Sequence, residues 1–256
     1  SSPAERWRIS IGLEGRELGR FDQGLYGCSE MFVNAFLKLI EAGIIRREVY
    51  DDTLLQQMLN AGRIKDETVT PETLRALLDA GRVRSPLPAE DLAFLKQYGV
   101  FRSGVTLDGE HLEFEGKRCS NNLLDEAVFD CVCSSMLGSR LTNGKFMTGG
   151  FFLGPRDFYE RLRTMPPQDL AKIDMTRIDF INQLYGNDTL KRAQRRKARF
   201  INTTMIVTLL GAAASDALEN GQVVSGVGGQ YNFVAMSHAL PDARLLMMLR
   251  ATHDNK

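Results

Sequence analysis

The chain has 256 residues, of which 43% are hydrophobic, so it can bury a full core as one large domain or two small ones. Lysine plus arginine and aspartate plus glutamate both number 32, and this balance favours neither nucleic acid nor a membrane surface as a partner. No apolar run is long enough to span a membrane, and the first residues, SSPAERWRISIG, lack the apolar region of a signal peptide. We therefore expect a cytoplasmic protein.

The sequence contains four cysteines, which are few for its length: Cys28, Cys119, Cys131 and Cys133. They include no Cys-x-x-Cys pair, so neither a disulfide framework nor a zinc site is expected. Cys28 is interpreted as a small buried thiol rather than a nucleophile, because no histidine lies near it in the sequence. His111 and His253 have no metal-ligand spacing with His238, so no metal is expected either. His238 itself is interpreted as a packed or helix-side residue.

The first predicted elements surround a candidate nucleophile. Trp7–Ile11 alternates polar and apolar residues, which suits a strand. From Met31 onwards, apolar residues recur at three- and four-residue spacing, which predicts an amphipathic helix ending at Gly43. Ser29 suits its N-cap, and Glu30 would then lie in the first turn, where the helix dipole stabilises a carboxylate by about 0.3–1 kcal/mol. Such a position suits a carboxylate nucleophile, but it equally suits a surface residue that compensates the dipole.

The segment from Asp51 to about Thr142 is predicted to be mostly helical. Helices are expected at Thr53–Ala61, Pro71–Ala80, Ala89–Tyr98 and Leu123–Leu137. Thr70-Pro71-Glu72 is a start signal for the second of these helices, and Gly81 could end it. Val105–Gly116 is predicted to form a hairpin on an Asp108-Gly109 turn.

Beyond this segment, a strand is predicted at Phe146–Leu153 and a helix from Asp157. Lys191–Arg199 (KRAQRRKAR) holds six basic residues in nine. We interpret this run as a solvated helix face, while binding of phosphate groups remains an alternative and RNA binding a weaker one. Phe200–Leu210 is rich in β-branched residues and is predicted to be a strand.

The last stretch predicts a β–turn–α–β unit. Its elements are a strand at Gln222–Val224, a glycine-rich turn, a helix at about Tyr231–Leu240 and a strand at Arg244–Arg250. Glycines in the turn let a ligand approach the backbone, and the following helix offers unpaired N–H groups to an anion. The turn is therefore a candidate oxyanion site, although such turns need bind nothing. It matches neither the dinucleotide fingerprint nor the P-loop.

Two motifs resemble those of the acetyl-CoA hydrolase/transferase family. SGVGGQYNF, which begins at Ser225, is similar to its GxGGQxDF motif, and GLYGCSEMFVNAFLKLIEAGII (Gly24–Ile45) is similar to its segment around Thr-Glu-Met. The resemblance covers about 24–50 and 144–253. It implies an α/β fold with an open, largely parallel sheet of the CoA-transferase (NagB/RpiA-like) type. Residues 1–256 would be the C-terminal domain of a longer protein, with an insertion at about 52–142. The missing N-terminal half and a homo-oligomer are the implied protein partners.

The resemblance also implies residue roles. Glu30 would be the nucleophile that forms a glutamyl-CoA intermediate, and the N–H groups of Gly228 or Gly229 would stabilise the oxyanion. The residues implied to bind substrate are Ser29, Asn202, Gly226, Val227, Gln230 and Asn232. Coenzyme A enters as an acyl-CoA substrate and a small carboxylate as the acceptor. If water intercepts the anhydride instead, the same site is a hydrolase.

The sequence has Ser29 where the family motif has Thr, and it lacks an acidic residue of the family pattern at three positions. The motif has Asp where this chain has Asn232, and acidic residues where it has Ile206 and Thr208. These losses leave open a second class of function, a transferase-like domain that has lost catalysis and uses its insertion to hold a partner. Retention of Glu30 and of the glycine turn favours the enzyme.

Overall fold

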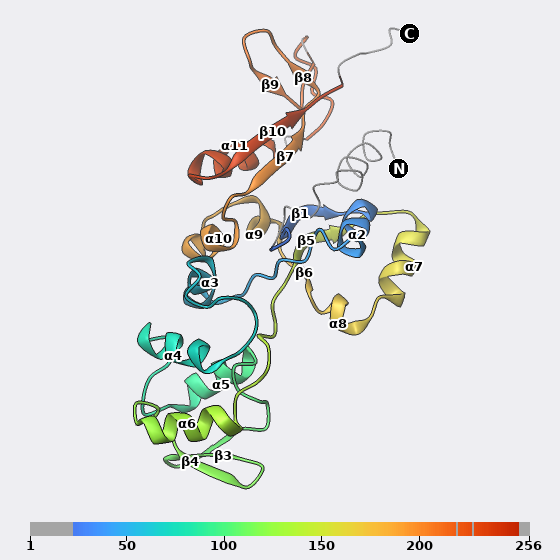
Figure 1. The fold of residues 1–256 in the computed structure, drawn as a ribbon. Helices are drawn as coiled ribbons and strands as arrows, with labels where there is room; N and C mark the ends of the chain where they lie inside the picture. Colours follow the sequence, from blue (N-terminus) through green and yellow to red (C-terminus); the bar gives the residue numbers. More distant parts are fainter. Residues whose placement is uncertain (1–22, 219, 227, 251–256) are drawn as a thin grey trace. The chain divides into compact units, whose positions relative to one another are not determined.

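A computed structural model describes residues 23–218, 220–226 and 228–250 (Figure 1). The chain divides into two compact units. The described part of the first unit comprises residues 23–27, 33–148 and 153–174, and that of the second comprises residues 28–32, 149–152 and most of 175–250. The strand predicted at Trp7–Ile11 lies outside the described residues. No helix in the described ranges is long and apolar enough to cross a membrane.

The first unit is built mainly from short helices. They are α2 (Asn34–Glu41), α3 (Thr53–Asn60), α4 (Pro71–Asp79), α5 (Ala89–Gln97), α6 (Glu126–Ser135), α7 (Arg156–Thr164) and α8 (Pro167–Leu170). An antiparallel sheet of three strands accompanies them: β2 (Thr106–Asp108), β3 (His111–Phe114) and β4 (Lys117–Ser120). The predicted helices α3, α4 and α5 are confirmed, and so is the hairpin, in which Leu107 pairs with Leu112.

Helices α2 to α5 all end in the same way. Each is followed by a glycine with positive φ, namely +67° at Gly43, +70° at Gly62, +69° at Gly81 and +71° at Gly99. Glycine adopts this conformation without the penalty that a Cβ atom imposes. The amide two residues beyond each glycine bonds back to the last helical turn, and its side chain is buried. The unit thus repeats a helix, a glycine and a buried apolar residue four times.

The segment predicted as an insertion has a hydrophobic core of its own, made of buried residues between Tyr50 and Leu141. Helix α6 is shorter than predicted, and β4 was not predicted. The structure also corrects the expectation of no disulfide, because Cys119 of β4 is bonded to Cys131 of α6, with 6.4 Å between their Cα atoms. The cysteine count alone could not reveal this pair, because only packing of α6 against the sheet brings them together.

A second sheet has the order β1–β5–β6, with β1 at Gly27–Phe32, β5 at Met147–Phe152 and β6 at Ile173–Met175. Strand β5 was predicted. Strand β1 corrects the prediction for Glu30, which lies in a strand and not in the first turn of a helix. Ser29 is not an N-cap, because α2 begins only at Asn34 and its N-cap makes no side-chain hydrogen bond. Phe32 explains the error, because its ring packs edge-on against Phe152 of β5 instead of along a helix face.

The second unit combines helices with a parallel strand pair. Its elements are α9 (Ile178–Asn182), α10 (Asp188–Gln194), β7 (Arg199–Thr203), β8 (Ile206–Val207), β9 (Ala213–Ala214), α11 (Gln230–Ala239) and β10 (Arg244–Met248). Strand β10 pairs in parallel with β7, and α11 lies along this pair (Figure 1). Phe200, Phe233, Met236 and Leu240 join the core of this unit.

Of the other predicted strands of this unit, one is shorter than predicted and one is wrong. The strand at Phe200–Leu210 stops after Thr203, because the chain then turns into the β8–β9 hairpin. Gln222–Val224 is not a strand, and only an isolated bridge between Ala217 and Val223 is present in this described stretch. The predicted helix and last strand are confirmed as α11 and β10. The fold is therefore mixed α/β, while its NagB/RpiA-like type stays a prediction.

Candidate functional site

The site forms in the second unit, where three segments far apart in the sequence meet. Glu30 on β1 is half-buried, and the side-chain Nδ2 of Asn182, at the end of α9, donates a hydrogen bond to its Oε1. Gly229, the N-cap of α11, lies against the same oxygen. A Cβ atom on Gly229 would overlap Glu30 Oε1 and would lie 3.3 Å from Asn182 Nδ2. Only glycine allows this close approach of carboxylate, amide and backbone.

The carboxylate of Glu30 is therefore next to a helix N-terminus, but the helix is α11 and not α2 as predicted. The first N–H groups of an α-helix have no partner within the helix, and its N-terminal end carries a partial positive charge. A negative charge on a carboxylate or on an oxyanion is favoured at such a place. The predicted environment of Glu30 is thus present, and tertiary structure supplies it from the opposite end of the chain.

Asn182 was missed by sequence reasoning. It is 7% exposed, and its Oδ1 has no hydrogen-bond partner among the described residues. No local motif marks it, because it lies in a short helix of mixed polarity and meets Glu30 across 152 positions. A buried amide directed at a carboxylate is a feature that only the tertiary structure shows.

Among the described residues, no hydrogen bond joins any other predicted site residue to Glu30. Ser29 Oγ donates to the carbonyl of Met31 at 2.9 Å, and Asn202 Nδ2 to that of Thr203 at 3.4 Å. Both are local contacts within their own strands.

The glycine turn itself is only partly involved. Gln230 Nε2 donates to Ala213 O at 3.0 Å and its Oε1 bonds to the Ser215 hydroxyl, so this side chain ties the turn to the β8–β9 hairpin. Gly226 is exposed, Gly228 has a φ of +59°, and Asn232 is half-buried in the first turn of α11. Val227 lies outside the described residues.

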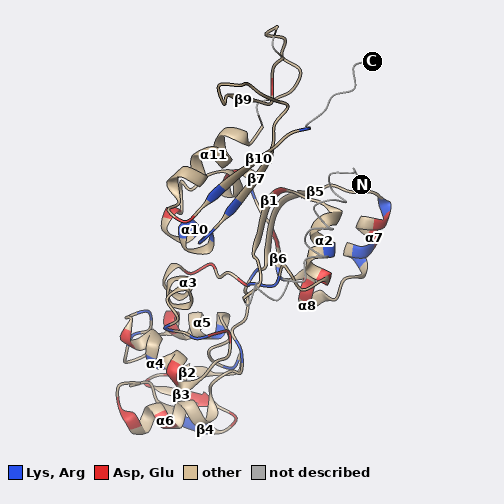
Figure 2. Cartoon of the chain, turned by 45° about the horizontal axis from the view of Figure 1, so that its top comes forward, with Lys and Arg blue, Asp and Glu red and all other residues tan. Residues whose placement is uncertain are grey.

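The basic run Lys191–Arg199 corrects another prediction, because it is not simply a solvated helix face. Helix α10 contains only its first part, and Figure 2 shows basic residues there and at the starts of β7 and β10. Lys191 is 3% exposed and Arg195 is 6% exposed. Arg192 behaves as expected of a surface residue, since it forms an ion pair with Asp188. Two cations of this run are therefore part of the interior.

His238 is a helix-side residue, as predicted. It is exposed, and its Nδ1 lies 2.9 Å from the carbonyl oxygen of Val234, one turn back on α11. Among the described residues, no cluster of three or more His, Cys, Asp or Glu side chains could hold a metal ion.

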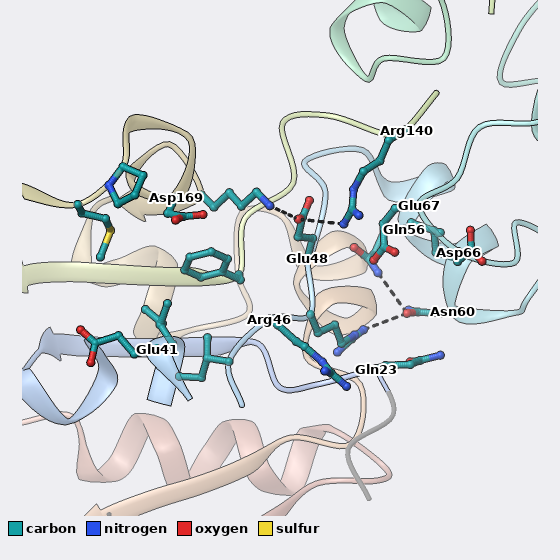
Figure 3. Close-up of a pocket in the computed structure, with 18 of the residues that line it drawn as sticks. Gln23, Glu41, Arg46, Glu48, Gln56, Asn60, Asp66, Glu67, Arg140 and Asp169 are labelled. Carbon is teal, nitrogen blue, oxygen red and sulfur yellow. Dashed lines mark hydrogen bonds and ion pairs between the residues drawn. The ribbon is translucent and has the colours of Figure 1, made fainter. Parts of the chain in front are cut away.

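A separate cavity of about 830 Å³ lies within the first unit (Figure 3). The buried carboxylate of Glu48 forms ion pairs with Lys172 at 2.7 Å and with Arg140 at 3.6 Å. Arg47 donates to Asn60 Oδ1 at 3.1 Å on the same wall. None of the predicted site residues lines this cavity, so it is not the place where Glu30 would act.

Together, the observations define a mixed α/β protein in which a carboxylate faces a glycine-rich helix start. Residues 154–256 match the family model of the acetyl-CoA hydrolase/transferase C-terminal domain. The resemblance predicted from the sequence is therefore confirmed over this range, which includes Asn182 and Gly229. Glu30 and the Gly24–Ile45 motif precede the matched range, so the resemblance there stays a prediction. No curated protein and no solved structure matches the chain.

Proposed function

We propose that this protein transfers coenzyme A between an acyl thioester and a small carboxylate, with Glu30 as the nucleophile. The observation that carries the proposal is the meeting of Glu30, Asn182 and Gly229. A half-buried carboxylate held by an amide against a helix start has what acyl transfer needs, namely a nucleophile next to donors for an oxyanion. The family match over residues 154–256 supports coenzyme A chemistry.

In the proposed reaction, a carboxylate oxygen of Glu30 attacks the thioester carbonyl carbon of acyl-CoA. The carbon–sulfur bond breaks, and coenzyme A leaves as a thiolate, which yields an acyl-glutamyl anhydride. The thiolate then attacks the glutamyl carbonyl carbon, the carboxylate of the acyl group leaves, and a glutamyl-CoA thioester remains. An acceptor carboxylate reverses these two steps and departs as the new acyl-CoA.

Asn182 and the two glycines have different roles in the proposed reaction. Asn182 holds Oε1 of Glu30, which orients the carboxylate for attack through the other oxygen. The N–H groups at Gly228 and Gly229 would face the negative charge that develops on the attacked carbonyl oxygen. One such donor typically contributes about 2.7–4 kcal/mol to the stabilisation of a transition state.

Transferase and hydrolase activity would differ in their exclusion of water from the intermediate and not in these residues. Water that attacks the anhydride or the glutamyl thioester restores the Glu30 carboxylate without a new acyl-CoA. The ratio of the two activities therefore depends on how well the site admits a carboxylate and keeps water out.

The test is to trap the intermediate. The intact natural protein is incubated with acetyl-CoA, treated with borohydride, which reduces a glutamyl thioester to an alcohol, and digested for mass spectrometry. We expect the reduced residue at Glu30, and Glu30→Gln as the matched control should show neither the adduct nor the turnover.

An unmodified Glu30, in protein shown to be folded and to bind coenzyme A, would overturn the catalytic assignment. The chain would then be a transferase-like binding module. A reduced residue at another position would overturn the assignment of Glu30 alone.

A further inference from the structure

Two buried cations lie next to the segment that carries Asn182, and they form no ion pair among the described residues. Lys191 is on α10 and Arg195 is its C-cap, one turn further on. Their side chains are almost entirely withdrawn from water, with residue exposures of 3% and 6%. Burial of a charged group is costly unless hydrogen bonds compensate it. The pKa of Lys191 is lowered by this burial and further by the charge of Arg195.

Both cations donate to main-chain carbonyl groups of one short stretch. Arg195 also donates to Met236 Sδ at 2.9 Å, and its Nε has no hydrogen-bond partner among the described residues. Arg195 donates to Phe180 O at 2.6 Å and to Ile181 O at 3.1 Å. Lys191 Nζ donates to Gln183 O at 2.8 Å and to Tyr185 O at 2.9 Å. The four bonds therefore hold the carbonyl groups on both sides of Asn182.

This arrangement follows from the shortness of α9. The last carbonyl groups of a helix have no partner within it, and cations are favoured at its C-terminal end. Helix α9 has five residues and ends at Asn182, after which the backbone is extended at Gln183, with φ −147° and ψ 157°. The Phe180 ring also makes cation–π contacts with both side chains, with its centroid 4.8 Å from Lys191 Nζ and 5.8 Å from Arg195 Cζ.

The held residue is the one that contacts the candidate nucleophile. The amide of Asn182 donates to Glu30, and its Oδ1 has no hydrogen-bond partner in the described chain. Its orientation therefore depends on its own backbone and on Glu30. The two cations hold that backbone.

We propose that Lys191 and Arg195 are positioning residues, which lock the end of α9 so that the Asn182 amide presents its N–H to the Glu30 carboxylate. This inference rests on the proposed function for its effect on turnover, but the positioning itself can be measured without turnover. In this proposal the cations act through Asn182, and no hydrogen bond between the described residues joins either cation to Glu30.

The test uses the intact protein with Lys191→Met and Arg195→Met, which retain side-chain volume and remove the donors. Lys197→Met, an exposed residue of the same basic run, is the matched control. We expect kcat to fall by about 10- to 100-fold with little change in KM for acyl-CoA, since small displacements of reacting groups cost rates of this size. Lys197→Met should leave both constants unchanged.

A merely structural role is distinguished by a double-mutant cycle. In an Asn182→Ala background, neither substitution should lower kcat further, because residues that act through one another are not additive. If Lys191→Met and Arg195→Met lower kcat by the same factor in wild type and in the Asn182→Ala background, the proposal is overturned. If Arg195→Met fails to fold, Arg195→Lys, which retains the charge but lacks the planar fork of donors of the guanidinium, serves in its place.

An NMR measurement separates this proposal from the proposed function. The side-chain amide signal of Asn182, assigned by its loss in Asn182→Ala, should shift in Glu30→Gln, in Lys191→Met and in Arg195→Met, but not in Lys197→Met. An unshifted signal in both cation variants would overturn the positioning role, whatever the activity. If the signal shifts as expected while wild-type protein yields no trapped Glu30 adduct, the positioning stands and only the catalytic proposal fails.

Discussion

The side-chain amide of Asn182 donates a hydrogen bond to the carboxylate of Glu30, and the two residues are 152 positions apart. The amide neutralises no charge, so it orients the carboxylate without forming an ion pair that would compete with attack. This contact connects the strand β1 to the domain that the family model matches. It is the contact on which the proposed chemistry depends most directly.

Substitution of Asn182 should separate orientation from charge. Asn182→Ala removes the donor, and we expect kcat to fall by about 10- to 100-fold because Glu30 loses its fixed orientation. Asn182→Asp should lose more, since it places a second negative charge beside Glu30. Turnover of acetyl-CoA and the yield of borohydride-trapped peptide measure both effects. Equal activity of the Asp and Ala variants would show that a second negative charge beside Glu30 does not affect turnover.

Gly229→Ala should disable the site with little effect on folding. The backbone at Gly229, with φ −88°, is accessible to alanine, but the added Cβ would overlap Glu30 Oε1. We expect a loss of kcat of about 100-fold from the displaced carboxylate, with a nearly unchanged melting temperature.

The control is Gly81→Ala, where φ is +69° and nothing lies within 4 Å of an added Cβ. There the strain of a left-handed conformation should cost about 1–2 kcal/mol of the free energy of unfolding without changing kcat. A large loss of stability in Gly229→Ala would contradict the explanation based on local overlap.

The Cys119–Cys131 disulfide should stabilise the first unit. It joins two residues 12 positions apart, for which the loss of chain entropy in the unfolded state predicts about 3 kcal/mol. The double variant Cys119→Ala, Cys131→Ala should unfold at lower urea concentration than wild type. A reductant should lower the unfolding midpoint of wild type and leave that of the double variant unchanged. Cys133→Ala is the control, because that thiol is free and half-buried. A peptide map without the Cys119–Cys131 cross-link in oxidised protein would refute the bond.

Acid should weaken the first unit through Asp91. Arg84 donates to this carboxylate from its guanidinium at 2.9 and 3.0 Å and from its backbone N–H at 2.8 Å, and these bonds lower the pKa of Asp91. A carboxyl group whose folded pKa is lower than its unfolded pKa of about 3.9 stabilises the fold above that value. This contribution is lost as the pH falls through about 4 towards the folded pKa.

The measurement is urea unfolding of wild type and Asp91→Asn at pH 7 and at pH 3. At pH 7 the variant should be less stable by about 1.5–3 kcal/mol, the range for hydrogen bonds to a charged group. At pH 3 the difference should shrink. A difference that stays constant with pH would show that the shape of the site, and not the charge of Asp91, matters.

Local signals in the sequence determined much of the first unit. Thr70 and Pro71 before α4, and the glycines after α3, α4 and α5, act within a few residues of the elements they bound. Helix propensity, capping and the freedom of glycine at positive φ are local effects, so they can be predicted without knowledge of the fold. The Asp108-Gly109 hairpin is another such case.

The sequence by itself also indicated Glu30 and the glycine turn, but only tertiary structure decided their surroundings. Periodic apolar residues placed Glu30 in a helix, yet pairing in a sheet and the packing of Phe32 make the segment a strand. The choice of Asn182 as partner, the burial of Lys191 and Arg195 and the Cys119–Cys131 bond all join residues distant in sequence. Such contacts depend on how whole elements pack, and no short window of sequence contains that information.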